Sequence, residues 1–174
     1  GDGGPATSAG LYGPSGVTAD GFGNLFIVER DDSRIRRVDS GGIITTVAGD
    51  GTCGFNGDGG SATSAELCYP WGVAVDGDGN LYIADYLNNR VRKADTAGII
   101  ATVAGNGAPG FGGDGGSATD AELNAPAGVA VDAAGNLYIA DSDNDRIRKV
   151  AGGLIDTFTG NGTVGFSGDG VGFS

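Results

Sequence analysis

The side chains best suited to chemistry in this sequence are carboxylates and amides in short polar loops. Two loops space three such side chains at alternate positions: Asp76, Asp78 and Asn80, and Asp141, Asp143 and Asp145. Loops that bind calcium through oxygen ligands use this spacing. Both loops lack the Glu that completes a helix–loop–helix calcium site, and the matching Gly21-Phe22-Gly23 has no middle carboxylate. Calcium is therefore the one cofactor to consider, and ordinary turn chemistry is the favoured explanation.

Other catalytic arrangements are missing from the sequence. It contains no histidine, so it can build neither a Ser-His triad nor a His-ligated zinc centre. Its two cysteines have no His partner and form no catalytic dyad. The residue types therefore predict a protein that is not an enzyme, with no catalytic residue and no cofactor other than calcium.

Cys53 and Cys68 lie in one polar segment, whereas the matching positions of the next segment hold Pro109 and Asn124. Two cysteines that occur together in one loop favour a disulfide over two free thiols. Closing a loop of this size stabilises a fold by about 3 kcal/mol. We therefore predict an oxidising compartment, and an extracellular or cell-surface location. The alternative is a pair of unrelated buried thiols.

An acidic residue and an arginine recur five residues apart. The three pairs are Glu29 and Arg34, Asp85 and Arg90, and Asp141 and Arg146. In a hairpin with a four-residue loop the two positions face each other, so a charge-assisted hydrogen bond would close the turn. We expect a structural pair, and a repeated binding feature is the alternative.

All these side chains belong to a sequence that repeats every 56 residues. The stretch GVAVDGDGNLYIADYLNNRVRKAD at residues 72–95 recurs at 16–39 and 128–151. Within one copy, alternating valines, an LYIA run and an IIATV run have the composition of short strands, and polar Gly-rich turns separate them. Each copy predicts four antiparallel strands with two apolar faces, which must stack against neighbouring sheets.

The pattern P-x-G-V-x-x-D-x-x-G-N-L-Y-I-A-D-x-x-N-N-R-I-R-K resembles the NHL repeat, and all three copies match it. The segments GFNGDGGSATSAEL and GFGGDGGSATDAEL are similar to linkers of long-period NHL repeats in bacterial extracellular proteins. The resemblance implies an all-β β-propeller of three four-stranded blades. Blades are expected at about 14–49, 70–105 and 126–160, and linkers at about 1–13, 50–69, 106–125 and 161–174. NHL propellers usually have six blades, so we expect half of a six-bladed ring.

Within the linkers, residues 61–67 and 117–123 combine a Ser or Thr cap with an acidic residue three places on. This pattern predicts a helix of one or two turns that closes over the blade edge.

Trp71 stands where the other copies have Ser15 and Ala127. Its place in the NHL pattern implies a position near the mouth of the central channel, where an exposed ring could stack on a sugar. Filling a gap between loops is the favoured alternative. Related lactonases surround a channel ion with carboxylates and amides, and none of these three residues is a carboxylate.

The net charge of −12 disfavours nucleic acid and anionic membranes as partners. No apolar run of about 18 residues exists, so we expect no membrane insertion. We predict a non-enzymatic NHL-like module for extracellular binding or self-assembly, with a protein or glycan ligand. Two copies could complete a ring or extend into a filament, or neighbouring repeats of a longer chain could complete it. The alternative is part of a metal-dependent lyase or lactonase-like enzyme whose site other repeats or chains complete.

Overall fold

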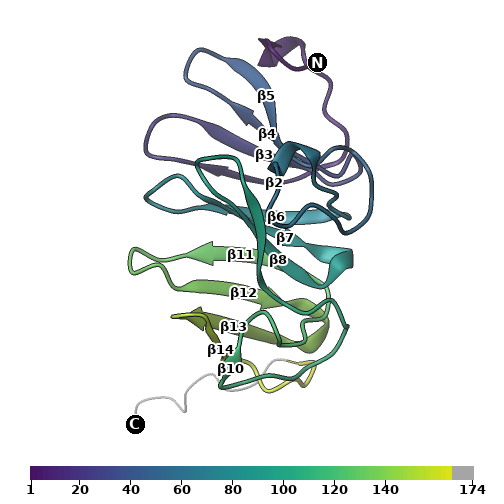
Figure 1. Cartoon of the computed structure of the whole chain (residues 1–174), viewed down its shortest axis with the longest axis vertical. Helices are drawn as coiled ribbons and strands as arrows, with labels where there is room; N and C mark the ends of the chain where they lie inside the picture. The colour runs from purple at the N-terminus through teal and green to yellow at the C-terminus, as the bar shows by residue number, and fades with distance from the viewer. Residues whose placement is uncertain (166–174) are drawn as a thin grey trace.

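Three antiparallel β-sheets follow one another in the computed structural model, which describes residues 1–165 (Figure 1). We call these sheets blades one, two and three. The main strands of blade one are β2 (Pro14–Ala19), β3 (Leu25–Glu29), β4 (Arg34–Val38) and β5 (Ile43–Ala48). Those of blade two are β6 (Pro70–Val75), β7 (Leu81–Asp85), β8 (Arg90–Ala94) and β9 (Ile100–Ala104). Those of blade three are β11 (Pro126–Val131), β12 (Leu137–Asp141), β13 (Arg146–Ala151) and β14 (Leu154–Thr159). The predicted all-β fold class is confirmed.

Short linker segments extend two of the blades. β1 (Gly4–Pro5) pairs with β5, and β10 (Gly116–Ser117) pairs with β14, so these two sheets have five strands. The described residues contain four 3₁₀ turns: η1 (Ala6–Ser8), η2 (Ala62–Ser64), η3 (Tyr86–Asn88) and η4 (Ser142–Asn144). The helix predicted over 61–67 is thus a single turn, and the one predicted over 117–123 is wrong, because Ser117 pairs with β14 instead. No helix within residues 1–165 is long and apolar enough to cross a membrane.

The hydrophobic core lies between neighbouring blades. Successive side chains of a strand point to opposite faces of the sheet, so Leu81 faces blade one and Tyr82 faces blade three. Residues buried between blades one and two include Phe26, Val28, Ile35, Val73, Leu81 and Ile83. Residues buried between blades two and three include Tyr82, Val91, Leu137, Ile139 and Ile155. Each blade therefore needs a neighbour on both faces to bury its apolar side chains.

The linkers form part of the same core. Leu67 and Leu123, one from each complete linker, are fully buried in the two interblade clusters. The linker backbone also bonds to the outer strand of the following blade, since the Gly59 N–H donates to the carbonyl of Ile100 at 2.8 Å. Each linker therefore covers the outer edge of the blade that follows it. The third predicted linker, at 161–174, lies mostly outside the described residues.

The inner strands β2, β6 and β11 approach one another closely. A Cβ added at Gly16 would lie 2.8 Å from the carbonyl oxygen of Trp71, and one added at Gly72 would lie 2.6 Å from that of Ala127. The Ser15 hydroxyl donates to the Trp71 carbonyl at 3.0 Å. Glycine is required at these positions because the neighbouring backbone fills the space of a side chain. The start of β6, which carries Trp71, is thereby held in place.

Candidate functional site

Four large side chains by which blade two departs from the repeat lie at one end of its strands. Tyr69, Trp71, Tyr86 and Leu87 in blade two correspond to Gly13, Ser15, Arg30 and Asp31 in blade one and to Ala125, Ala127, Ser142 and Asp143 in blade three. They come from the start of β6 and from η3, which adjoin because Pro70 pairs with Asp85 in the sheet. We call Tyr69, Trp71, Tyr86 and Leu87 the aromatic patch.

The aromatic patch is accessible to solvent and extends to blade one. The ring centres of Trp71 and Tyr86 are 5.2 Å apart, with 35° between their planes. Trp71 is 39% exposed, Tyr69 42% and Leu87 52%. The guanidinium carbon of Arg30, from blade one, lies 5.1 Å from the centre of the Trp71 ring, in a cation–π geometry. The patch therefore lies at the boundary between two blades.

The backbone around the aromatic patch is constrained. Tyr69 has a φ of 49°, in the left-handed region that is costly for a bulky residue. The preceding residue, Cys68, forms a disulfide with Cys53, as the sequence predicted. The Leu87 N–H donates to the Cys68 carbonyl at 3.1 Å, so the η3 turn is attached to the cross-linked linker. The disulfide and this hydrogen bond thus hold the backbone of the patch in place.

Arg30 supplies the positive charge of this surface. Its Nε donates to the Asp31 carboxylate at 2.8 Å. The pKa of Arg30 is raised, first by this hydrogen bond and then by the negative charge of Asp31. The surface therefore combines exposed rings with one guanidinium held in position.

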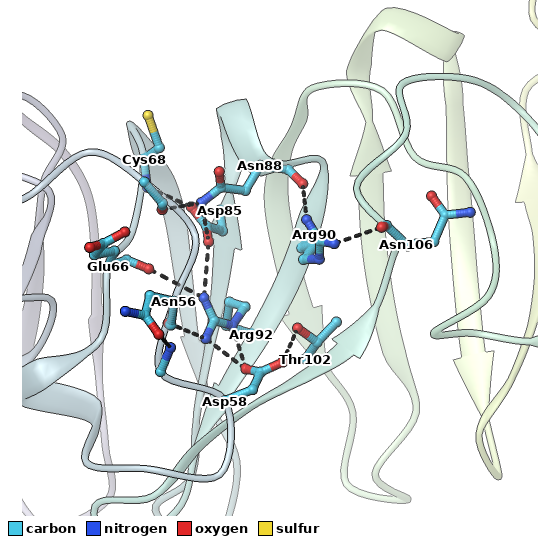
Figure 2. A network of polar contacts seen from close by, with 12 residues as sticks. Asn56, Asp58, Glu66, Cys68, Asp85, Asn88, Arg90, Arg92, Thr102 and Asn106 are labelled. Carbon is cyan, nitrogen blue, oxygen red and sulfur yellow. Dashed lines mark hydrogen bonds and ion pairs between the residues drawn. The ribbon is translucent and has the colours of Figure 1, made fainter.

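The acid–arginine pairs predicted from the sequence are wrong, because each acid binds a different arginine from the one expected. The register places Asp85 opposite Arg90, but the Asp85 carboxylate accepts from Arg92 at 3.4 Å. Arg90 instead donates to the carbonyls of Asn88 and Asn106, as Figure 2 shows. The other blades make the same choice: Glu29 pairs with Arg36 and Asp141 with Arg148, rather than with Arg34 and Arg146. The arginines that face the acids across the hairpins are instead engaged by backbone carbonyls: Arg34 by Asp50, Arg90 by Asn106 and Arg146 by Asn161.

Arg92 is the centre of a buried polar network that joins the linker to the hairpin (Figure 2). Arg92 and Asp85 are fully buried. Arg92 also donates to Asp58 of the linker at 2.6 Å, and Asp85 accepts from the Cys68 N–H at 2.7 Å and from Asn88 at 2.9 Å. Burial raises the pKa of Asp85 to about 6, although these hydrogen bonds oppose the shift. The network therefore fixes the disulfide half-cystine next to the aromatic patch.

Sequence reasoning missed both the buried arginines and most of the aromatic patch. The arginines could have been found from the repeat, because they recur at the same spacing as the linker aspartates that they bind: Arg36 with Asp2, Arg92 with Asp58, and Arg148 with Asp114. Tyr69 and Tyr86 could have been found as departures from the repeat beside Trp71.

The predicted calcium loops serve turn geometry in the structure. The Asp76 carboxylate accepts from the backbone of Asp78 and Asn80, at 3.1 Å and 2.8 Å, and from the Asn80 side chain. Asp141 is fully buried, whereas Asp143 and Asp145 are exposed, so this loop does not bring its carboxylates together. Within residues 1–165 no three His, Cys, Asp or Glu side chains gather as a metal site would require. Calcium binding stays a prediction.

The chain is similar in sequence to one protein-family model and to several known proteins. The family model described as the teneurin NHL domain matches three overlapping stretches, residues 1–55, 50–111 and 107–167. Mouse teneurin-4 is 31% identical over 231 aligned residues, which cover 86% of this chain and 8% of teneurin-4. The chloroplastic protein SUPPRESSOR OF QUENCHING 1 of Arabidopsis thaliana is 31% identical over 146 residues, 79% of this chain and 14% of that protein. The chain thus spans a small part of these relatives' length.

Solved structures share the fold. A Bacteroides thetaiotaomicron protein of unknown function aligns with a TM-score of 0.65 and 28% identity, over 73% of this chain and 32% of that one. A chain of the nidogen/laminin complex aligns with a TM-score of 0.60 and 19% identity, over 85% and 48% of the two chains. Virginiamycin B lyase from Staphylococcus aureus aligns with a TM-score of 0.55 and 15% identity, over 83% and 40%. The last two likenesses show the fold alone.

Proposed function

Because the chain belongs to the teneurin NHL domain family, we propose that it is a non-enzymatic binding module that works outside the cell. The observation that carries this proposal is the aromatic patch, where four departures from the repeat and the disulfide meet on one exposed surface. A repeat protein that only had to stack its blades would have no use for exposed rings at positions where its other blades have small or polar residues. The disulfide supports an extracellular or cell-surface location.

A protein ligand fits this surface better than a sugar. Stacking on a sugar needs an open ring face, but Tyr86 and Arg30 both lie within 5.2 Å of the Trp71 ring centre. Trp, Tyr and Arg are also the residues most enriched in the energetic centres of protein–protein interfaces. We therefore take the aromatic patch as a protein-binding surface centred on Trp71.

An array of purified secreted and cell-surface ectodomains, with a glycan array beside it, tests this function. We expect saturable binding to an ectodomain, and a loss of at least about tenfold in affinity for Trp71→Ala and for Tyr69→Ala. Both substitutions introduce the residue that blade three has at that position. Ala127→Ser, at the Trp71 position of blade three, is the matched control. Glycan binding in place of protein binding, or an unchanged affinity in both patch variants, would contradict the proposal.

Self-association is a second candidate function, favoured by the end blades. Val17 of blade one is 64% exposed, whereas Val73, at the same position of blade two, is 8% exposed. Leu25 is 38% exposed and its counterpart Leu81 is 5% exposed. We propose that another blade covers this face, supplied by a second copy in a ring or filament, or by a neighbouring repeat of a longer chain. The rival enzymatic function, with a site completed by other repeats, has no such observation in its favour.

A further inference from the structure

A cavity of about 440 Å³ lies between blades one and two, which we call the interblade cavity. It borders the turn that follows β6, whereas the aromatic patch includes the start of β6, so the two lie at opposite ends of the strands. Its volume is within the range of small-molecule sites, roughly 300–1,000 Å³. Its walls carry Asp20, Phe26, Arg37, Val47, Leu81 and Asp95, among others.

Arg37 brings to this cavity a guanidinium that has no protein partner. Its Nε is buried and accepts no hydrogen-bond partner from residues 1–165. The Nε atoms of Arg36 and Arg148 are also unpaired, but the terminal nitrogens of both arginines bind carboxylates. Every arginine other than Arg37 in this part of the chain donates to a carboxylate or a carbonyl. Leaving a partly buried charge unpaired is costly, so an acceptor from outside the chain would be favoured there.

Two departures of blade one from the repeat meet in the interblade cavity. Phe26 and Arg37 are register partners across β3 and β4, and both other blades have a tyrosine and a lysine at these positions. In blade two the Tyr82 hydroxyl donates to Asp76 at 3.2 Å, and blade three repeats this bond at 3.3 Å. Asp20 is the counterpart of Asp76, and Phe26 has no hydroxyl to donate to it. The Asp20 carboxylate therefore keeps an acceptor position that a tyrosine fills in the other two blades.

Two carboxylates lie on the walls of the interblade cavity. The hydrogen bond from Asn24 lowers the pKa of Asp20, so this group is charged at neutral pH. One oxygen of Asp95 accepts two backbone N–H groups, and within residues 1–165 its other oxygen accepts none. Both acids thus have room for a further hydrogen-bond donor.

The charges of the interblade cavity select the kind of ligand. A simple anion would meet two carboxylates, and a simple cation would meet the guanidinium. A small molecule that carries both a carboxylate and an ammonium satisfies all three groups, because a guanidinium binds a carboxylate through two parallel hydrogen bonds. We propose that this cavity binds a free α-amino acid, with its carboxylate on Arg37 and its ammonium on Asp20 and Asp95. An apolar side chain of the ligand lies against Val47 and Leu81.

Calorimetric titration of the standard L-amino acids into the full chain tests the ligand class. We expect saturable binding of at least one amino acid with an apolar side chain. The matching amine without the carboxylate, and the matching acid without the ammonium, should each bind at least about tenfold more weakly. An amine or acid that binds as tightly as its amino acid would overturn the proposal. So would binding of glucose or inorganic phosphate with no binding of any amino acid.

Two variants locate the site, and each introduces the residue that blades two and three have. Phe26→Tyr supplies the hydroxyl that occupies Asp20, and should weaken amino-acid binding by at least about tenfold. Arg37→Lys removes the two-bond contact and should weaken it by about fivefold. Lys149→Arg, at the Arg37 position of blade three, is the matched control and should bind as the wild type does. An unchanged affinity in either Phe26→Tyr or Arg37→Lys refutes the site.

Discussion

At the scale of single residues, the fold contains ion pairs whose two side chains are both fully buried. Arg92 with Asp85 and Arg148 with Asp141 are fully buried pairs, one in each of two blades. Removing two charges from water is costly, and the cost is recovered only where further hydrogen bonds satisfy both groups. The contacts of Asp85 with Cys68 and Asn88 offset part of that cost in blade two, but burial still disfavours the charged carboxylate and raises its pKa.

The raised pKa of Asp85 predicts a measurable pH dependence. The pKa of this carboxyl is near 3.8 in the unfolded chain and about 6 in the folded protein. Its protonated form therefore stabilises the fold fully below pH 4, and this contribution is lost as the pH rises through 6. The full loss corresponds to about 3 kcal/mol of unfolding free energy. We expect urea unfolding to show that the stability of Asp85→Asn relative to the wild type rises by about 3 kcal/mol between pH 4 and pH 7.

The exposed Asp143→Asn serves as the control for that experiment, and its stability should follow the wild type at every pH. Asp141, whose pKa burial also raises, contributes the same slope to all three proteins. A constant difference between Asp85→Asn and wild type from pH 4 to 7 would refute the assignment.

At the scale of elements, the close approach of the inner strands sets how blades stack. β2, β6 and β11 meet backbone to backbone, and a glycine from each earlier blade makes room for the carbonyl of the next. Such contacts leave no space for even one methyl group, and a packed interior gives way only at a cost. Gly16 and Gly72 are thus required by the contact between neighbouring blades, and not by the geometry of a turn.

A matched pair of substitutions tests this interface. Gly72→Ala should lower the unfolding free energy by about 1–3 kcal/mol, because the new Cβ would meet the Ala127 carbonyl oxygen at 2.6 Å. Gly128→Ala, at the same position of blade three, meets only the Ala140 side chain at 3.4 Å within its own chain and should be tolerated in the unassociated protein. Thermal and urea unfolding measure both. Equal stability of the two variants would show that the inner strands yield more easily than the geometry indicates.

At the scale of the whole molecule, the two outer faces of the stack expose side chains at positions that are buried in its interior. The face of blade one that exposes Val17 and Leu25 corresponds to the face of blade two that is buried against blade one. Blade three likewise exposes Ala130 where blade two buries Ala74. The outer face of blade one and the outer face of blade three are therefore the same two kinds of face that pack together between neighbouring blades. Two different faces that fit each other are the condition for head-to-tail association.

We accordingly expect light scattering to give a mass that rises with concentration above the 17.0 kDa of one chain. Val17→Lys should reduce association by placing a charge in the apolar face, whereas Leu87→Lys, at an exposed site elsewhere, should not. Gly128→Ala should also reduce it, because a blade docked on blade three would meet the added methyl group. A stable monomer with cooperative unfolding at every concentration would contradict the prediction.

Much of this architecture was predictable from residues that are neighbours in the sequence. The 56-residue period, the alternating valines of β6 and the polar turns determined the strands, their order and the NHL family, which the comparisons confirm. Cys53 and Cys68 were predicted to form a disulfide because they occur in one loop, and they do. These inferences succeeded because strand periodicity and turn chemistry act over a few residues.

The choice of partners was decided only by the tertiary structure. Asp85 faces Arg90 across the hairpin, yet it binds Arg92, which the linker Asp58 also binds, while Arg90 donates to the Asn106 carbonyl. The aromatic patch forms because β6, η3 and Arg30 of another blade come together in space. Of these residues, the sequence identified only Trp71 as a candidate site. Burial and distance between segments far apart in the chain determine which charges and rings meet, and no local pattern records either quantity.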